Sequence, residues 1–291
     1  MKNILNYYYK MIVDDLDNRY FSYNNHLFYL CEYKRNITES DALDYLNMLM
    51  IENNILINQI VKNIFNSIVT YHDNKYYSLI MINYQYKDGY GTKFIRAFNN
   101  PKLDILKRNN WGKLWSIKID YIEYQLKHIK NSYPLINNSV NYYIGLAENA
   151  ISYFNMLDLN NVSLYISHRR INTSNIYNPL ELVIDYKARD IGEYIKNNFF
   201  NGEMTMLDIK KYLSELELEN IDYILIYVRL LYPSYYFDLY ESIINDQKDE
   251  KEINIITDLV NQYEELLYEV YSLFKRKINI LGIEWINNKY M

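Results

Sequence analysis

The stretch from Ser163 to Ile195, SLYISHRRINTSNIYNPLELVIDYKARDIGEYI, governs how the rest of the chain is interpreted. It contains an apolar run that ends at His168, a polar segment rich in Asn, Ser and Thr, and a second apolar run that ends at Asp185. Runs of β-branched and aromatic residues on either side of a polar segment predict two strands joined by a loop. We therefore expect a loop over residues 168–175 and a strand over residues 181–186.

The polar residues of this stretch have the spacing that phosphoryl transfer from a nucleotide needs, with one exception. Such a site holds Mg²⁺ with a carboxylate and an amide oxygen, and places a second carboxylate beside the acceptor hydroxyl. A loop of the form His-x-Asp-x-x-x-x-Asn, followed by a strand that bears Asp, supplies all three groups. His168, Asn175 and Asp185 fit this layout, but Arg170 stands where the loop acid belongs. Arginine stays protonated and cannot act as a base.

Further cations set the stretch apart. Arg169 stands where a glycine is usual, and Lys187 follows Asp185 by two residues, where a second acid is often found. We expect the guanidinium of Arg169 or Arg170 to pair with Asp185 and to replace Mg²⁺ as its counter-charge. A basic patch for a phosphate-rich partner is the alternative explanation of the two arginines.

The segment ISHRRINTSNIYNPLELVIDYKARDIG resembles the catalytic segment of the aminoglycoside phosphotransferase and choline kinase superfamily, which usually reads roughly HGDLHPGNIL...LIDWE. Within that superfamily, NYYIGLAENAISYF upstream and YVRLLYPSYYFDLYESII downstream resemble the endospore coat-associated kinase-like family. The resemblance covers residues 115–244 and, more loosely, the N-terminal part. It implies a protein-kinase-like α+β fold with two lobes, a small antiparallel-sheet N-lobe and a larger, mainly helical C-lobe, with the site in a cleft between them.

Carried over residue by residue, the resemblance implies that Asn175 and Asp185 match the Mg²⁺-binding pair and that His168 orients the loop. The catalytic aspartate has no counterpart, so no catalytic residue is intact in the degenerate loop of His168, Arg169 and Arg170. We expect no firmly bound cofactor; ATP and Mg²⁺ are the ligands that the resemblance implies.

Lys34, at the end of LFYLCEYK, is the candidate for the strand lysine that binds nucleotide phosphates in this superfamily. A solvated lysine at a strand end is the plainer interpretation. The chain has no glycine before Gly89, so it lacks a glycine-rich loop over the phosphates.

The predicted N-lobe spans residues 1–88. RYFSYNNHLFYLCEY predicts a hairpin with its turn at Asn24-Asn25, and NSIVTYHDNKYYSLIMINY predicts two more strands with a turn at Asp73-Asn74. Between them, TESDALDYLNMLM predicts a helix with Thr38 as N-cap and Asp41 as its capping-box partner. The segment Asp88–Gly91 marks the predicted boundary to the C-terminal lobe, residues 89–291.

Helical periodicity dominates the predicted C-terminal lobe. Apolar residues recur every three or four positions, which is the spacing of a buried helix face. The clearest example is the series Trp115, Ile119, Ile122, Leu126 and Ile129.

Composition narrows the classes of partner. The net charge of -5 and pI near 5.5 argue against nucleic acid. The single cysteine, Cys31, excludes an internal disulfide, and four scattered histidines predict no structural metal.

The longest apolar run has about ten residues, whereas a membrane span needs about 20. The first residues also lack the pattern of a signal peptide, so we expect a soluble protein. The 35 tyrosines indicate either an AT-rich genome or a surface for a packed assembly.

The sequence thus favours a catalytically degenerate kinase-like protein, a pseudokinase. The resemblance implies a role in spore coat assembly or sporulation, with other spore coat proteins and a nucleotide as partners, and a location in the mother-cell cytoplasm or the spore coat. The alternative is an active small-molecule phosphotransferase that uses a substitute acid, with Asp190 or Glu193 as candidates. A helical interaction protein without kinase ancestry is a third hypothesis.

Overall fold

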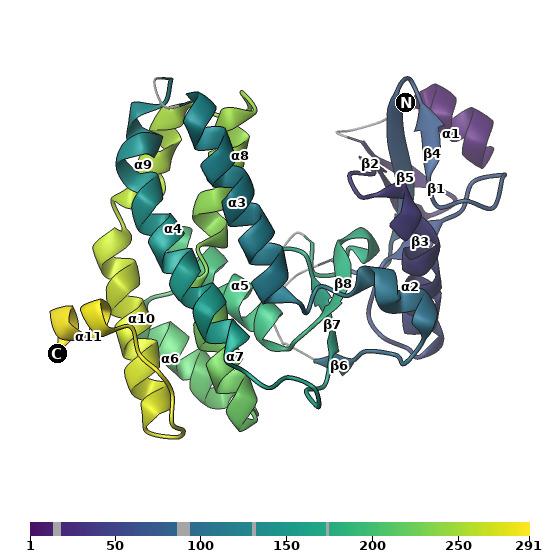
Figure 1. Ribbon diagram of the computed structural model, residues 1–291. Coiled ribbons are helices and arrows are strands. Elements are labelled where there is room, and N and C mark those ends of the chain that lie inside the picture. Colours follow the sequence, from purple (N-terminus) through teal and green to yellow (C-terminus); the bar gives the residue numbers. More distant parts are fainter. Residues whose placement is uncertain (14–18, 86–93, 130–131, 173–174) are drawn as a thin grey trace. The chain divides into compact units, whose positions relative to one another are not determined.

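The computed structural model describes residues 1–13, 19–85, 94–129, 132–172 and 175–291, and Figure 1 shows its ribbon. The chain divides into two compact units, each made of separate stretches of sequence. Unit 1 comprises residues 1–107 and 165–184, and unit 2 comprises residues 108–164 and 185–291. The predicted boundary Asp88–Gly91 lies outside the described residues. The predicted catalytic loop belongs to the same unit as the N-terminal sheet.

Unit 1 contains a five-stranded antiparallel sheet of order β1-β2-β5-β3, in which β4 also pairs with β5. Both predicted turns are confirmed. Asn24 and Asn25 have φ values of 47° and 62°, and Asp73 and Asn74 have 48° and 59°. Asn and Asp adopt this left-handed conformation more readily than other non-glycine residues, so each pair closes a two-residue hairpin. The strands are β1 (Tyr20–Tyr23), β2 (His26–Glu32), β3 (Gln59–Val61), β4 (Thr70–His72) and β5 (Lys75–Ile82).

Two helices accompany this sheet. Helix α1 (Lys2–Tyr9) buries Ile4 and Leu5 in an apolar cluster with Phe28 and Leu30 of β2. Helix α2 (Ser40–Glu52) contacts β3 and buries an apolar face of Ala42, Leu43, Leu46 and Met50.

The predicted N-cap of α2, Thr38, is wrong. The N-cap of α2 is instead Glu39, which makes no side-chain capping bond. Asn36 caps the turn before it, because its side chain accepts a hydrogen bond from the Thr38 backbone N–H at 3.1 Å. That bond starts a short 3₁₀ helix, η1 (Ile37–Glu39), so α2 begins at Ser40.

A second, small sheet of order β6-β7-β8 carries the predicted loop. The predicted strand–loop–strand arrangement is confirmed, because the loop leaves β7 at His168 and the chain returns through β8 to Asp185. The elements are β6 (Ile95–Arg96), η2 (Pro101–Leu106), β7 (Tyr165–His168), η3 (Pro179–Glu181) and β8 (Leu182–Asp185).

Unit 2 is helical, as the periodicity predicts. Helix α3 (Trp111–Ile129) buries Trp115, Ile119 and Ile122 and pairs with α4 (Pro134–Asn155), while α5 (Ala188–Phe200) packs against α7 (Asn220–Leu231). Figure 1 shows these helices side by side. The remaining elements are α6 (Met206–Glu215), α8 (Ser234–Ile244), η4 (Glu250–Ile253), α9 (Asn254–Thr257), α10 (Val260–Lys275) and α11 (Glu284–Tyr290). Among the described helices, none combines the length and apolarity that crossing a membrane demands.

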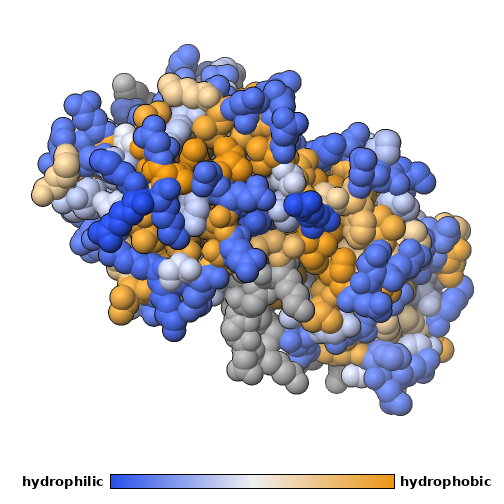
Figure 2. Space-filling model, turned by 90° about the horizontal axis from the view of Figure 1, so that it is seen from below, coloured by the Kyte–Doolittle hydropathy of each residue, from blue (hydrophilic) through white to orange (hydrophobic). Residues whose placement is uncertain are grey.

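The tyrosines contribute more to the interior than to the surface. Among the tyrosines that the structure describes, thirteen belong to the buried core and seven are exposed, so more of them pack in the core than lie at the surface. The exposed ones are Tyr7, Tyr20, Tyr71, Tyr76, Tyr84, Tyr121 and Tyr124. On the face that Figure 2 shows, apolar residues are interspersed with hydrophilic ones.

Candidate functional site

The loop after β7 is held by its own polar side chains. His168 Nε2 lies 2.9 Å from the carbonyl oxygen of Ile176, which ties the start of the loop to its end. Asn175 Nδ2 donates to the carbonyl oxygen of Arg170 at 2.7 Å, and its Oδ1 accepts the Asn172 N–H at 2.9 Å. The loop thus brings His168, Arg170 and Asn175 together, and it uses the Asn175 amide for internal hydrogen bonds.

Arg170 occupies the acid position with its backbone engaged in this loop. Its Nη1 donates to the carbonyl oxygen of Arg169 at 2.9 Å, and the Arg169 N–H donates to Glu181 O at 2.8 Å, beside β8. A guanidinium beside these carbonyls can donate hydrogen bonds but has no lone pair with which to accept a proton.

Asp185 lies at the end of β8 and is fully buried, with no exposed surface. Its Oδ1 accepts hydrogen bonds from Trp111 Nε1 at 2.9 Å and from the Tyr186 N–H at 2.7 Å. Its Oδ2 accepts from Arg189 Nη1 at 2.6 Å, and Trp111 Nε1 lies 3.0 Å away. Burial raises the pKa of the Asp185 carboxyl, while Arg189, Arg229 and the Trp111 N–H act in the opposite direction.

Arg189 is a site residue that the sequence reasoning missed. It stands in the first turn of α5, four residues after Asp185, and forms a buried ion pair with it. The only sequence signal is this spacing across a strand–helix junction. The predicted pairing of Asp185 with Arg169 or Arg170 would join residues of two units, and it stays a prediction.

Helix α5 carries more buried charges, and helix α7 supplies several of their partners. Lys187, just before α5, pairs with Asp222 at 3.0 Å. Glu193 accepts from both Nε and Nη2 of Arg229 at 2.8 Å and pairs with Lys196 at 2.7 Å. Four acids and four bases are buried in this region, so their formal charges cancel; they are Asp185, Asp190, Glu193, Asp222, Lys187, Arg189, Lys196 and Arg229.

Arg229 connects this charged region to the aromatic core. Its guanidinium carbon lies 5.1 Å from the ring centre of Trp111 and 5.5 Å from that of Trp115, within the range of cation–π attraction. Because Trp111 also donates to Asp185, the indole contacts an anion at its edge and a cation at its face.

Gly192 allows α5 and α7 to approach each other this closely. A Cβ atom at Gly192 would lie 2.7 Å from Arg229 Cγ and 3.0 Å from Arg229 Cβ. These Arg229 atoms sit close to the backbone of α7, and the guanidinium beyond them is fixed by Glu193, so they cannot move aside without displacing the ion pair.

We expect Gly192→Ala to destabilise the protein by about 1–3 kcal/mol, because the added methyl group overpacks this contact. Gly145→Ala in α4 is the matched control, since a Cβ there meets no atom within 4 Å. The control should stabilise by about 0.5–1 kcal/mol through the lower flexibility of the unfolded chain. Urea unfolding of both variants measures the difference, and a stabilising Gly192→Ala would show that the helices are not in close contact.

In unit 1, Lys34 and Arg35 have different environments. Lys34 is exposed and follows β2 rather than lying within it. Arg35 is instead the anchored cation: its Nε lies 2.6 Å from Glu39 Oε2, and its Nη1 donates to the carbonyl oxygens of Leu180 and Leu182 at 2.9 and 2.6 Å. Arg35 therefore fixes the segment before α2 to the strand β8 within the same unit.

Residues 2–270 match the model of the protein family described as "Spore coat putative kinase YutH". The chain belongs to this family. A curated relative, the endospore coat-associated protein YutH of Bacillus subtilis (strain 168), is 28% identical over 207 residues. The matched region is 60% of this chain and 61% of that protein, so the YutH-family chain spans about three fifths of the length of its relative.

Solved structures with the same fold are aminoglycoside phosphotransferases. The enzyme from Alicyclobacillus acidocaldarius subsp. acidocaldarius DSM 446 is 10% identical with a TM-score of 0.55, and the match covers 90% of this chain and 91% of that one. Spectinomycin phosphotransferase APH(9)-Ia in complex with ADP and spectinomycin is 11% identical, with a TM-score of 0.54. The match covers 99% of this chain and 97% of that one. Its AMP-bound complex is 9% identical, with a TM-score of 0.57, and the match covers 93% of this chain and 96% of that one.

At these identities the likeness shows the fold alone. The YutH-family chain has an aminoglycoside phosphotransferase-like fold, and the kinase-like class predicted from the sequence is confirmed.

The geometry of Asp185 does not fit a magnesium ligand, although the fold implies one. Mg²⁺ needs oxygen atoms with free lone pairs and keeps several water molecules in its shell. Both Asp185 oxygens already accept protein N–H groups, and the side chain has no exposed surface. Nor do the described residues of this YutH-family chain contain a group of three His, Cys, Asp or Glu side chains that could hold a metal ion.

Proposed function

We propose that this protein is a catalytically degenerate kinase-like protein that acts by binding other proteins in spore coat assembly or another sporulation step. The observation that carries the proposal is the state of Asp185, whose carboxylate is buried and bonded to Trp111, Tyr186 and Arg189. The replacement of the loop acid by Arg170 supports the loss of catalysis. Membership of the YutH family and the name of the Bacillus relative support the role in the spore coat.

The alternative, an active phosphotransferase with a substitute acid, has less support. Glu193 is 5% exposed and paired with both Lys196 and Arg229, so its carboxylate is committed to the interior of unit 2. Asp190 is also 5% exposed, in the first turn of α5. A general base must reach the hydroxyl of its substrate, and neither carboxylate is placed at the surface where a substrate could meet it.

In this proposal, nucleotide binding differs from that of an active kinase in its dependence on Mg²⁺. The solved neighbours are described in complexes with ADP and AMP, which supports a nucleotide as ligand. Since Arg189 already neutralises Asp185, Mg²⁺ gains no ligand there. We propose that nucleotide affinity is weak and independent of Mg²⁺.

Thermal unfolding with ATP tests the proposal. A ligand that binds only the folded state raises stability by RT ln(1 + [L]/Kd). We expect the same shift in Tm, or none, for ATP in EDTA and ATP with Mg²⁺. We also expect no ATP turnover over a panel of amino sugars, amino alcohols and sugars.

Arg170→Asp provides the matched variant, because it restores the loop acid and keeps Trp111, Tyr186 and Arg189 as hydrogen-bond donors to Asp185. It is expected to stay inactive. Turnover by the parent chain that depends on Mg²⁺ and disappears in Asp185→Ala, with that variant still folded by circular dichroism, would refute the pseudokinase and establish the phosphotransferase.

A further inference from the structure

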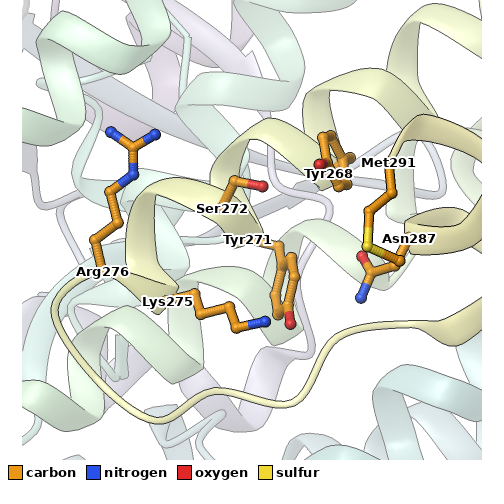
Figure 3. Close-up of a pocket in the computed structure, with 7 residues that line it drawn as sticks. All are labelled: Tyr268, Tyr271, Ser272, Lys275, Arg276, Asn287 and Met291. Carbon is orange, nitrogen blue, oxygen red and sulfur yellow. The ribbon is translucent and has the colours of Figure 1, made fainter.

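A cavity of about 320 Å³ lies in unit 2 between α10, α11 and the last residue of the described chain. It is separate from the loop and strand described above, and Figure 3 shows the side chains around it. Its volume is at the lower end of the roughly 300–1,000 Å³ that small-molecule sites occupy. None of its seven lining side chains is acidic, whereas those of Lys275 and Arg276 are basic.

The polar groups around this cavity are not paired within the described residues. Asn287 Oδ1 is buried and accepts no hydrogen bond. The hydroxyl groups of Tyr271 and Ser272 and the ammonium of Lys275 have no hydrogen-bond or ion-pair partner in the described part of the chain. A buried acceptor without a donor costs stability, so a ligand that donates to Asn287 would recover a lost interaction.

The directions of these side chains define what the cavity can bind. The Lys275 nitrogen lies 5.4 Å from the ring centre of Tyr271, and Figure 3 shows it directed toward that side chain, with Asn287 on the other side. The Arg276 guanidinium points away from Tyr271 and Asn287, so it lies at the rim. The cavity therefore offers one inward cation, hydroxyl donors and one amide acceptor, next to the apolar surface of Tyr268 and Met291.

We propose that this cavity binds a small carboxylate with a neighbouring N–H group and an apolar side chain, the chemistry of an N-acylated amino acid or a peptide C-terminus. Lys275 and the Tyr271 hydroxyl bind the carboxylate. Asn287 Oδ1 accepts the ligand N–H, and the ligand side chain packs on Tyr268 and Met291. A phosphate dianion fits less well, because a single cation points inward and Asn287 Oδ1 would face a ligand oxygen without a proton.

The inference does not depend on whether the protein is a pseudokinase. Its residues lie on α10, on α11 and at the chain end, and the loop, Asp185 and the buried charges of α5 take no part in it.

Titration calorimetry with the full chain and defined probes tests the chemistry of the ligand. We expect N-acetyl-L-leucine to bind with Kd on the order of 1 mM or tighter. N-acetyl-L-leucinamide, which lacks the carboxylate, and 4-methylpentanoate, which lacks the N–H, should each bind at least about tenfold more weakly. Inorganic phosphate that binds more tightly than N-acetyl-L-leucine would overturn the proposal, as would equal affinity for the acid and the amide.

Variants test the residues. Lys275→Gln is expected to weaken binding about tenfold, and Asn287→Asp should weaken it further, because its carboxylate repels that of the ligand. Lys127→Gln is the matched control, since Lys127 is likewise an exposed lysine in the last turn of a helix, α3. Thermal unfolding checks that each variant is folded. Undiminished binding by folded Lys275→Gln would contradict the proposal.

The same titration distinguishes the two sources of this chemistry. A pentapeptide that ends in leucine with a free carboxylate and binds more tightly than N-acetyl-L-leucine identifies a protein C-terminus as the ligand. Equal affinity identifies a small molecule. An amidated peptide that binds as well as the free acid would overturn the proposal.

Discussion

Asp185→Ala is expected to lower the free energy of unfolding by about 3–5 kcal/mol, the usual result of removing one partner of a buried ion pair. The buried Arg189 guanidinium, 2.6 Å from Asp185, would lose this ion pair. The N–H groups of Trp111 and Tyr186 would lose their acceptor as well. Urea unfolding in metal-free buffer measures the change.

A double variant separates charge from packing. In Asp185→Leu combined with Arg189→Met both charges are absent, and replacing a buried pair by apolar residues is often neutral or stabilising. We expect the double variant to be more stable than Asp185→Ala. A residue whose only role is to bind a metal would change stability little in metal-free buffer. A loss below about 1 kcal/mol for Asp185→Ala would therefore contradict the structural role assigned to this carboxylate.

Glu193→Ala is expected to have an effect of similar size, about 3–5 kcal/mol, because one carboxylate serves two buried bases. Lys196 and Arg229 lie 2.7 and 2.8 Å from Glu193, and their side chains are 2% and 3% exposed. Lys196 keeps its bond to Ser234 Oγ at 2.6 Å, but Arg229 loses its hydrogen-bonded anion.

The ion pair of Lys248 and Glu252 is the matched control for burial. Its 2.7 Å separation equals that of the Lys196–Glu193 pair, but its side chains are 45% and 34% exposed. Exposed pairs contribute roughly 0–1 kcal/mol, so Glu252→Ala should leave stability nearly unchanged. Chemical unfolding of the two alanine variants side by side tests this contrast, and equal losses would mean that burial does not decide the strength of the Glu193 pairs.

Local patterns in the sequence predict the elements of this fold well. Asn24-Asn25 and Asp73-Asn74 specify their turns because short polar side chains tolerate positive φ. The predicted N-cap of α2 was wrong because Asn36 and Thr38 are both good capping residues, and the sequence does not reveal that Asn36 caps a separate 3₁₀ turn before the helix. Two lobes were predicted, but not that each unit consists of two separate stretches of sequence, since a chain that leaves a unit and returns has no local signature.

The loop and strand of the candidate site were predictable from the sequence, but the partners of the buried charges were not. The spacing of His168, Asn175 and Asp185 identified the loop and the strand. It did not identify Arg189, because charged residues at the start of a helix normally indicate a solvated face. The α7 partners of Lys187 and Glu193 lie about 35 residues further along the chain, and only packing brings them together.

The interleaved course of the chain has a consequence for its synthesis on the ribosome. Domains generally fold as units while the polypeptide emerges. Here β7 and β8, which complete unit 1, are synthesised only after α3 and α4. Helices α3 and α4 belong to unit 2, and they cannot complete its packing until α5 and α7 have been synthesised. Neither unit can finish folding during the first half of translation, so the nascent chain exposes unfinished apolar surfaces for longer than a protein of two consecutive domains would.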